Sequence, residues 1–270
     1  MRLWALALTI TLVAAIVPPS APAEARLDPV AALRVQLESG NGVTFSSVTI
    51  FTAWDGKPRT TRRSGVHELA HGGIIASELL DPEDGKDPEH FIIFPDRYYE
   101  QSSFWRKRLP EGKSWGVVKD KQSFTLTCGD IRLTNPATLK ALLAGTKARH
   151  PAGVYDGTRT TLHEGIITLG EIAMVDPDLR IGTSRPTGAY AQVRINWKLW
   201  IGQDQLVRRC HSSSWYPGFL GADDLDPYQL VDDVRLSRWG RPTDIKPPAP
   251  DQVATSDEIN LPGEAPVAPR

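Results

Sequence analysis

The residues best suited to chemistry are those of the run His67-Glu68-Leu69-Ala70-His71. The run satisfies the pattern H-E-x-x-H, in which two histidines on one face of a helix bind zinc and the glutamate activates water. That arrangement needs a long helix, yet Ser64-Gly65 precede the run and Gly72-Gly73 follow it. We therefore expect a surface strand or turn with two solvated histidines. The alternative is a zinc-dependent hydrolase that uses His67, Glu68 and His71.

The other polar clusters carry no catalytic signature. His163-Glu164 has no partnered serine, cysteine or metal cluster and is expected on an exposed strand edge. The pairs Asp223-Asp224 and Asp232-Asp233 lack the spacing of a calcium loop, so we expect them to solvate turns. No nucleophile elbow, phosphate loop or dinucleotide fingerprint occurs. We therefore predict a binding protein with no catalytic residues, metal or cofactor, and not an enzyme.

The first 25 residues have the features of a secretory signal. Arg2 supplies a positive start, Leu3–Val17 is apolar, and small-x-small cleavage sites end at Ala23 and Ala25. The apolar run is about 15 residues, short of the ~20 that a spanning helix needs. We expect cleavage near Ala23 or Ala25 and an extracytoplasmic, secreted mature chain. The alternative is an uncleaved anchor.

The chain has two cysteines, Cys128 and Cys210. An even number of cysteines in an exported protein favours a disulfide. We predict that the two residues form one, with two separate buried thiols as the alternative.

The composition narrows the choice of partner. The chain has 270 residues with 31 basic against 32 acidic side chains, a formal net charge of -1. This balance gives no electrostatic reason to expect nucleic acid or an acidic membrane surface as partner. The 22 glycines and 22 prolines favour many turns and short strands over long helices.

The clearest strand in the sequence is Ala191–Ile201. Its apolar residues alternate with Gln192, Arg194, Asn196 and Lys198. Because side chains alternate between the faces of a strand, the apolar set should share one face, toward a core or a cavity. That set is Ala191, Val193, Ile195, Trp197, Leu199 and Ile201.

A short helix and a hairpin follow one another before this strand. Asn135 is a suitable N-cap and Pro136 fits the first helical turn. The helix carries an apolar stripe and should end at Gly145 in the left-handed conformation. Asp156-Gly157 then predicts a two-residue hairpin turn. The stripe consists of Leu139, Leu142 and Leu143.

The rest of the chain reads as strands joined by tight turns, so we predict a mainly β protein with antiparallel strands and a few helices. Ala31–Glu38 is ambiguous between helix and strand, and residues 254–270 are expected to form a disordered, Pro-rich tail. Further strands are expected within Val43–Trp54, Thr60–Leu80, His90–Tyr99, Trp105–Val118 (a hairpin turning at Glu111-Gly112), Ser123–Leu133, Leu206–Cys210 and Val234–Trp239.

Several ordered segments resemble the LolA/LppX-type proteins of actinobacterial envelopes. Each segment is short, but their order and spacing agree with that group from about Trp105 to Val253. The segments are Lys113-Ser114-Trp115, Asn135-Pro136 with its leucine stripe, Asp156-Gly157 with Thr160-Thr161 and Gly165, Gln205–Arg209, Val234–Ser237, and Gly240–Ile245 with Pro247-Pro248-Ala249.

The resemblance implies an antiparallel half-barrel of about ten or eleven strands, spanning residues 26–253, that wraps around helices and encloses an apolar cavity. Members of the group carry lipids or acyl chains of lipoproteins. Many have a lipid-modified cysteine after the signal, whereas residues 18–28 of this chain contain none. The disulfide does not follow from the resemblance.

We therefore predict a monomeric envelope protein that binds a lipid or acyl chain, with an envelope lipoprotein or membrane transporter as docking partner. Besides the zinc hydrolase, the alternative is a non-catalytic structural or sensor domain whose cavity is filled by its own side chains. The expected cavity residues are Leu139, Leu142, Leu143, Ile166, Val193, Ile195, Trp197 and Leu199.

Overall fold

The computed structural model describes residues 28–53, 55–82, 88–119, 125–180, 184–218, 227–255 and 258. The predicted signal segment, nearly all of the predicted tail and the pair Asp223-Asp224 lie outside these ranges. The domain boundaries at residues 25 and 254 therefore stay predictions.

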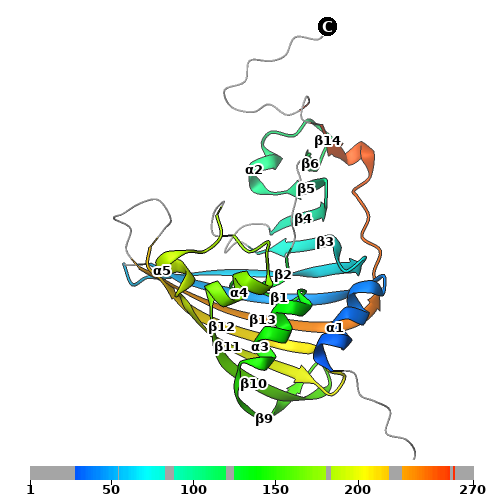
Figure 1. Ribbon diagram of the computed structural model, residues 1–270. Helices are drawn as coiled ribbons and strands as arrows, with labels where there is room; N and C mark the ends of the chain where they lie inside the picture. The colour runs from blue at the N-terminus through cyan, green and yellow to red at the C-terminus, as the bar shows by residue number, and fades with distance from the viewer. Residues whose placement is uncertain are drawn as a thin grey trace, which may run out of the picture.

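One large sheet dominates the structure (Figure 1). Its strands are β1 (Asn41–Thr52), β2 (Pro58–Ala70), β3 (Gly73–Asp81), β4 (Glu89–Phe94), β5 (Arg97–Gln101), β6 (Trp115–Val118), β9 (Thr146–Tyr155), β10 (Thr158–Thr168), β11 (Arg194–Gly202), β12 (Val207–Tyr216), β13 (Tyr228–Pro242) and β14 (Val253–Ala254). A separate small hairpin consists of β7 (Thr127–Cys128) and β8 (Ile131–Arg132).

The 12 strands follow the order β14-β6-β5-β4-β3-β2-β1-β13-β12-β11-β10-β9. All neighbours are antiparallel except β14 and β6. The sheet remains open, because β9 and β14 are its two edges. The first strand, β1, lies at the centre and pairs with β13, from Asn41 opposite Pro242 to Thr52 opposite Gln229. The predicted mainly β fold, an antiparallel half-barrel with few helices, is confirmed.

Three short helices cover one face of the sheet (Figure 1). They are α1 (Pro29–Glu38), α3 (Pro136–Ala144) and α4 (Leu169–Val175). The remaining helical turns are α2 (Ser103–Arg106), α5 (Gly188–Ala191) and η1 (Pro250–Gln252). Apolar side chains of the three covering helices form one buried cluster with the middle strands, so this covered, concave face holds the core. The cluster includes Leu33, Leu37, Leu139, Leu142, Leu169, Ile172, Trp197, Leu199, Val234 and Leu236.

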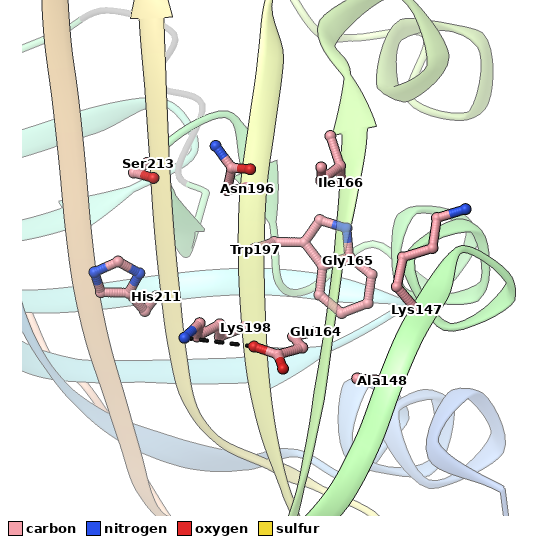
Figure 2. Close-up of a pocket in the computed structure, with 10 residues that line it drawn as sticks. All are labelled: Lys147, Ala148, Glu164, Gly165, Ile166, Asn196, Trp197, Lys198, His211 and Ser213. Carbon is pink, nitrogen blue, oxygen red and sulfur yellow. Dashed lines mark ion pairs between the residues drawn. The ribbon is translucent and has the colours of Figure 1, made fainter.

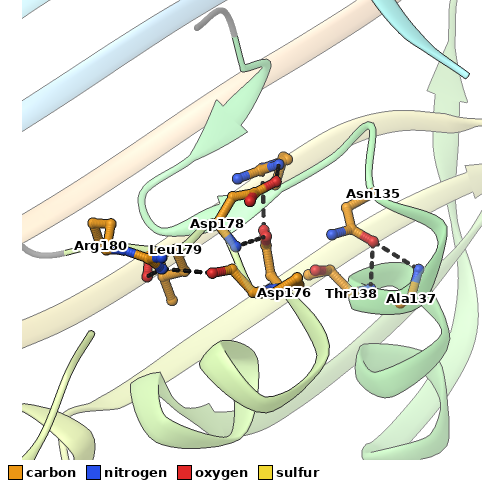
Figure 3. Close-up of polar contacts among 9 residues, drawn as sticks. Asn135, Ala137, Thr138, Asp176, Asp178, Leu179 and Arg180 are labelled. Carbon is orange, nitrogen blue, oxygen red and sulfur yellow. Dashed lines mark hydrogen bonds and ion pairs between the residues drawn. The ribbon is translucent and has the colours of Figure 1, made fainter. Parts of the chain in front are cut away.

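The start of α3 is fixed by its N-cap, as the sequence predicted. Asn135 Oδ1 accepts hydrogen bonds from the N–H groups of Ala137 and Thr138, at 2.8 and 3.3 Å (Figure 3). The predicted left-handed ending at Gly145 is wrong: its φ is -87°. The N–H of Gly145 instead bonds the last carbonyl groups of the helix, and the chain continues directly into β9.

The hairpin between β9 and β10 turns at Asp156-Gly157, as predicted. Both residues have positive φ, 49° and 72°, which a type I′ turn requires. The Asp156 carboxylate accepts from Arg208 Nη1 at 3.0 Å and from the N–H of Arg238 at 2.9 Å. These bonds tie the tip of the hairpin to β12 and β13.

Some predicted strands are helical or shorter. Trp105 lies in α2, where the Ser102 hydroxyl accepts from its N–H, so the expected hairpin over Trp105–Val118 is wrong. Ala191 ends α5, and β11 begins only at Arg194. The ambiguous segment Ala31–Glu38 is helical, because Asp28 caps α1 through the N–H of Ala31 at 2.8 Å.

After β13, the chain crosses the other face of the sheet before it forms β14. The side chain of Ile245 packs against the cluster of Ile92, Tyr99 and Trp115. The N–H of Ile245 donates to Glu68 Oε2 at 3.0 Å. This C-terminal strap therefore covers the convex face of the half of the sheet that contains β2 to β6.

Cys128 and Cys210 form a disulfide with a Cα–Cα distance of 6.2 Å, which confirms the predicted pairing. The bond joins the hairpin β7–β8 to β12, and both cysteines are fully buried. Ser212 Oγ donates to the carbonyl of Cys128 at 3.1 Å and holds the same junction.

Removing this cross-link should lower the stability of the fold. The bond closes a loop with a sequence separation of 82 residues. On the chain-entropy model, the double variant Cys128→Ala/Cys210→Ala should lose about 4 kcal/mol of unfolding free energy. Urea unfolding monitored by tryptophan fluorescence measures this loss, and reduced wild-type protein serves as the matched control. An unchanged unfolding midpoint in both samples would contradict the prediction.

Candidate functional site

The face of β11 that lies under the helices is apolar. Ile195, Trp197 and Leu199 are buried, while the alternating residues Arg194, Asn196 and Lys198 are exposed. The predicted orientation of this strand is therefore correct. Val193, just before the strand, is buried as well.

Helix α3 seals this face with its leucines. Leu139 and Leu142 are 3% and 1% exposed and belong to the same buried cluster as Trp197 and Leu199. Leu143 packs against that cluster but remains partly exposed. The space directly beneath α3 is thus filled by side chains, and an apolar cavity in that position stays a prediction.

Ile166 faces away from this cluster, so its predicted orientation is wrong. It pairs with Asn196, and cross-strand partners share a face of the sheet. Its side chain is 38% exposed. The neighbouring Ile167 points inward and is buried. Two adjacent isoleucines give no sequence signal for which of them is inside.

Trp197 lies close against Gly165, its partner on β10 (Figure 2). A Cβ atom at position 165 would lie 2.6 Å from Trp197 Cζ2, so only glycine fits beneath the indole ring. The indole Nε1 and the hydroxyl of Thr138 on α3 are both buried without a hydrogen-bond partner among the described residues. An apolar layer thus holds two unsatisfied polar groups, each of which is costly to bury.

A groove opens beside this layer, between α3, α4 and the end of β10. There β9 no longer pairs with β10, because their last paired residues are Thr146 and Gly165. The residues of β10 after Gly165 form its bare end, which does not pair with β9. The groove has a volume of about 280 Å³, close to the lower limit of ~300 Å³ for ligand pockets. It is lined by Ala141, Gly145, Ile166, Ile167, Glu171, Met174, Val175 and Trp197.

A second hollow of about 310 Å³ adjoins the groove and shares Ile166 and Trp197 with it (Figure 2). Lys147 and the ion pair of Lys198 with Glu164, at 3.4 Å, lie along this hollow. The two openings therefore meet at the bare end of β10, next to the Trp197 indole.

The sequence analysis missed α4, which supplies Leu169 and Ile172 to the cluster. A signal was present: Thr168 and Glu171 form a capping box, with reciprocal bonds of 3.2 and 2.7 Å. Asp176 at the end of α4 forms an ion pair with Arg132 Nε at 3.1 Å, which ties this helix to β8.

The H-E-x-x-H residues lie on β2 and the turn that follows it, and their side chains do not converge. His67 points into the concave face, stacked on Phe45 at 4.6 Å between ring centroids. Its Nδ1 lies 2.7 Å from Ser77 Oγ. Glu68 points to the convex face and holds the C-terminal strap, and His71 is an exposed turn residue.

The expectation of a solvated His67 is wrong, because its side chain is only 4% exposed. Within the described ranges, no group of three or more His, Cys, Asp or Glu side chains is arranged to hold a metal ion.

Asp232 and Asp233 do not solvate a turn as expected, because both lie within β13 and point to opposite faces. Asp232 is buried and accepts from Thr49 Oγ1 at 2.6 Å, and burial raises the pKa of its carboxyl group. Asp233 forms an ion pair with Arg209 on the convex face. The two carboxylates therefore cannot share a calcium ion.

No protein-family model and no curated protein matches the chain. Among solved structures, lipoprotein LppX of Mycobacterium tuberculosis is similar over 81% of this chain and 98% of its own, at 14% identity and a TM-score of 0.39. MucB is similar over 86% of this chain and 63% of its own, at 12% identity and a TM-score of 0.32.

A LolA-superfamily protein of Nitrosomonas europaea is similar over 77% of this chain and 90% of its own, at 11% identity and a TM-score of 0.28. Two of these three structures are an LppX lipoprotein and a LolA-superfamily protein. The fold class itself rests on the sheet order and the helices described above. No helix within the described residues is both long and apolar enough to cross a membrane.

The buried His67 should make stability depend on pH. Burial lowers its pKa to about 4, from an ordinary 6.5. Below pH 6.5 the unfolded chain binds a proton that the native chain does not, so stability falls as the pH falls through this window. Between pH 7 and pH 5 this one residue should remove about 2 kcal/mol of unfolding free energy.

The variant His67→Phe should lose this part of the pH dependence, because phenylalanine can stack on Phe45 without titrating. Urea unfolding at pH 7 and pH 5 gives the difference for each protein. The exposed His150→Phe is the matched control and should keep the wild-type difference. An equal pH dependence in wild type and His67→Phe would refute the assignment.

Proposed function

We propose that this chain is an exported cell-envelope protein that binds a lipid or acyl chain between its covering helices and the concave face of its sheet. The observation that carries the proposal is the groove beside α3 and α4, which opens onto the apolar layer around Trp197. Such a site offers apolar area, at ~25 cal/mol per Å² buried, and few polar groups. These properties suit an acyl chain.

A full acyl chain needs more room than the groove provides, so binding requires α3 or α4 to move away from the sheet. Both helices are short, and each begins at its own side-chain cap. Displacing α3 would extend the groove along Leu139 and Leu142. It would also uncover the unpartnered Thr138 hydroxyl and Trp197 Nε1, which can donate to an ester or carboxylate oxygen.

The location and partners are part of the same proposal. The disulfide supports an oxidising, extracytoplasmic compartment, and the segment 1–25 would serve as a signal cleaved near Ala23 or Ala25. The mature chain would act as a monomer. It would receive or deliver its ligand at a membrane transporter or an envelope lipoprotein.

Filling the groove should weaken binding of a fluorescent long-chain fatty acid. Ala141→Trp places a large ring in the groove from the partly exposed side of α3. Excluding about two methylene groups, at ~0.8 kcal/mol each, should raise the Kd by about tenfold. Fluorescence titration measures the Kd, and thermal unfolding confirms that the variant folds.

The matched control is Val35→Trp, which adds the same ring to the exposed side of α1, outside the groove. It should bind like wild type. If wild type binds no fatty acid, the carrier function fails and a self-filled envelope domain takes its place. If both variants bind equally well, the groove is not the site.

A further inference from the structure

The mouth of the groove combines exposed apolar side chains with cations. Met174 on α4 is 83% exposed, an unusual position for so large an apolar residue, and Ile166 is 38% exposed. Lys147 and Arg149 are exposed on the edge strand β9. We call these four residues the groove rim.

The groove rim is continuous. Met174 and Ile166 line the groove together, and Ile166 and Lys147 line the adjoining hollow. Figure 2 shows Lys147 extending beside the bare end of β10, next to Ile166. Arg149 lies two residues further along β9, opposite His163.

The two cations are available to a partner. Neither Lys147 nor Arg149 forms an ion pair within the described residues, whereas the nearby Lys198 is paired with Glu164. The pKa of Glu171 is lowered mainly by hydrogen bonds from Thr168, and Lys147 contributes a smaller part of the lowering. Glu171 is thus already engaged in the cap of α4.

The edge itself is poorly suited to pairing with a strand of another protein. Pro151 interrupts the N–H groups of β9, and Lys147 and Arg149 place charge on it. The groove rim instead presents cations beside apolar side chains, the combination that binds the surface of an anionic bilayer. Since the formal net charge of the chain is -1, this attraction must be local.

We propose that the groove rim docks on an anionic phospholipid surface, with Lys147 and Arg149 at the headgroups and Met174 and Ile166 inserted among them. In this position the groove opens toward the bilayer. The docking goes beyond the proposed function. Only the passage of an acyl chain from the bilayer into the groove rests on the proposed function.

Vesicle flotation tests the docking with the mature chain. The protein should float with vesicles of phosphatidylglycerol and phosphatidylcholine but not with phosphatidylcholine alone, and less so as salt is raised. Lys147→Glu/Arg149→Glu should reduce the bound fraction by at least tenfold, because each cation near an anionic surface contributes about fivefold to binding. Met174→Asp should also reduce binding, whereas Met174→Leu should preserve it.

The matched control is Lys57→Glu/Arg62→Glu, which makes the same change of charge at exposed positions away from the groove. It should bind like wild type. Equal loss in this control, equal binding to neutral vesicles, or no binding by wild type would overturn the proposal. Fatty-acid titration separates the two functions: vesicle binding without fatty-acid uptake leaves the docking in place and removes the carrier function.

Discussion

The packing of the covering helices on the concave face closes one side of an open sheet, and the rest of the structure depends on that closure. A sheet with one apolar face must cover it, and the second sheet among the described residues is only the two-stranded hairpin β7–β8, which contributes Cys128 and Ile131 to the cluster. The cover consists of α1, α3 and α4, whose leucines and isoleucines complete one cluster with Trp197, Leu199 and Val234. The proposed function requires one of these separate short helices to move away from the sheet.

Local signals were sufficient wherever one physical rule decided the structure. The alternation along β11, the Asn135 cap and the Asp156-Gly157 turn were all readable from sequence. Local signals failed where tertiary contacts decided. Trp105 resembles a strand residue, but its ring packs in the space that Gly116 leaves on β6.

For the candidate site, the sequence predicted the leucine stripe and the inward face of β11 but not the groove. The groove depends on where β9 ends relative to β10, and pairing registers are not visible in one strand alone. The inward orientation of Ile167 in place of Ile166 depends on the pairing of β10 with β11.

The H-E-x-x-H run shows how strongly secondary structure controls the meaning of a motif. On a strand, neighbouring residues serve opposite faces, so His67 contributes to the core while Glu68 anchors the C-terminal strap. The whole-chain charge is similarly uninformative about one surface. A net charge near zero conceals Lys147 and Arg149, the exposed cations on the edge strand β9.

The pairing of β1 with β13 also determines when the protein can finish folding. This pairing at the centre of the sheet joins residues that are far apart in sequence, from Asn41 opposite Pro242 onward. Contacts so distant in sequence form slowly, because a long loop must close before they do. While the chain is being synthesised, β1 must wait for β13, and the edge of β1 that faces β13 stays unpaired during that interval. Folding of this protein therefore depends on conditions that keep the incomplete sheet from pairing with other chains.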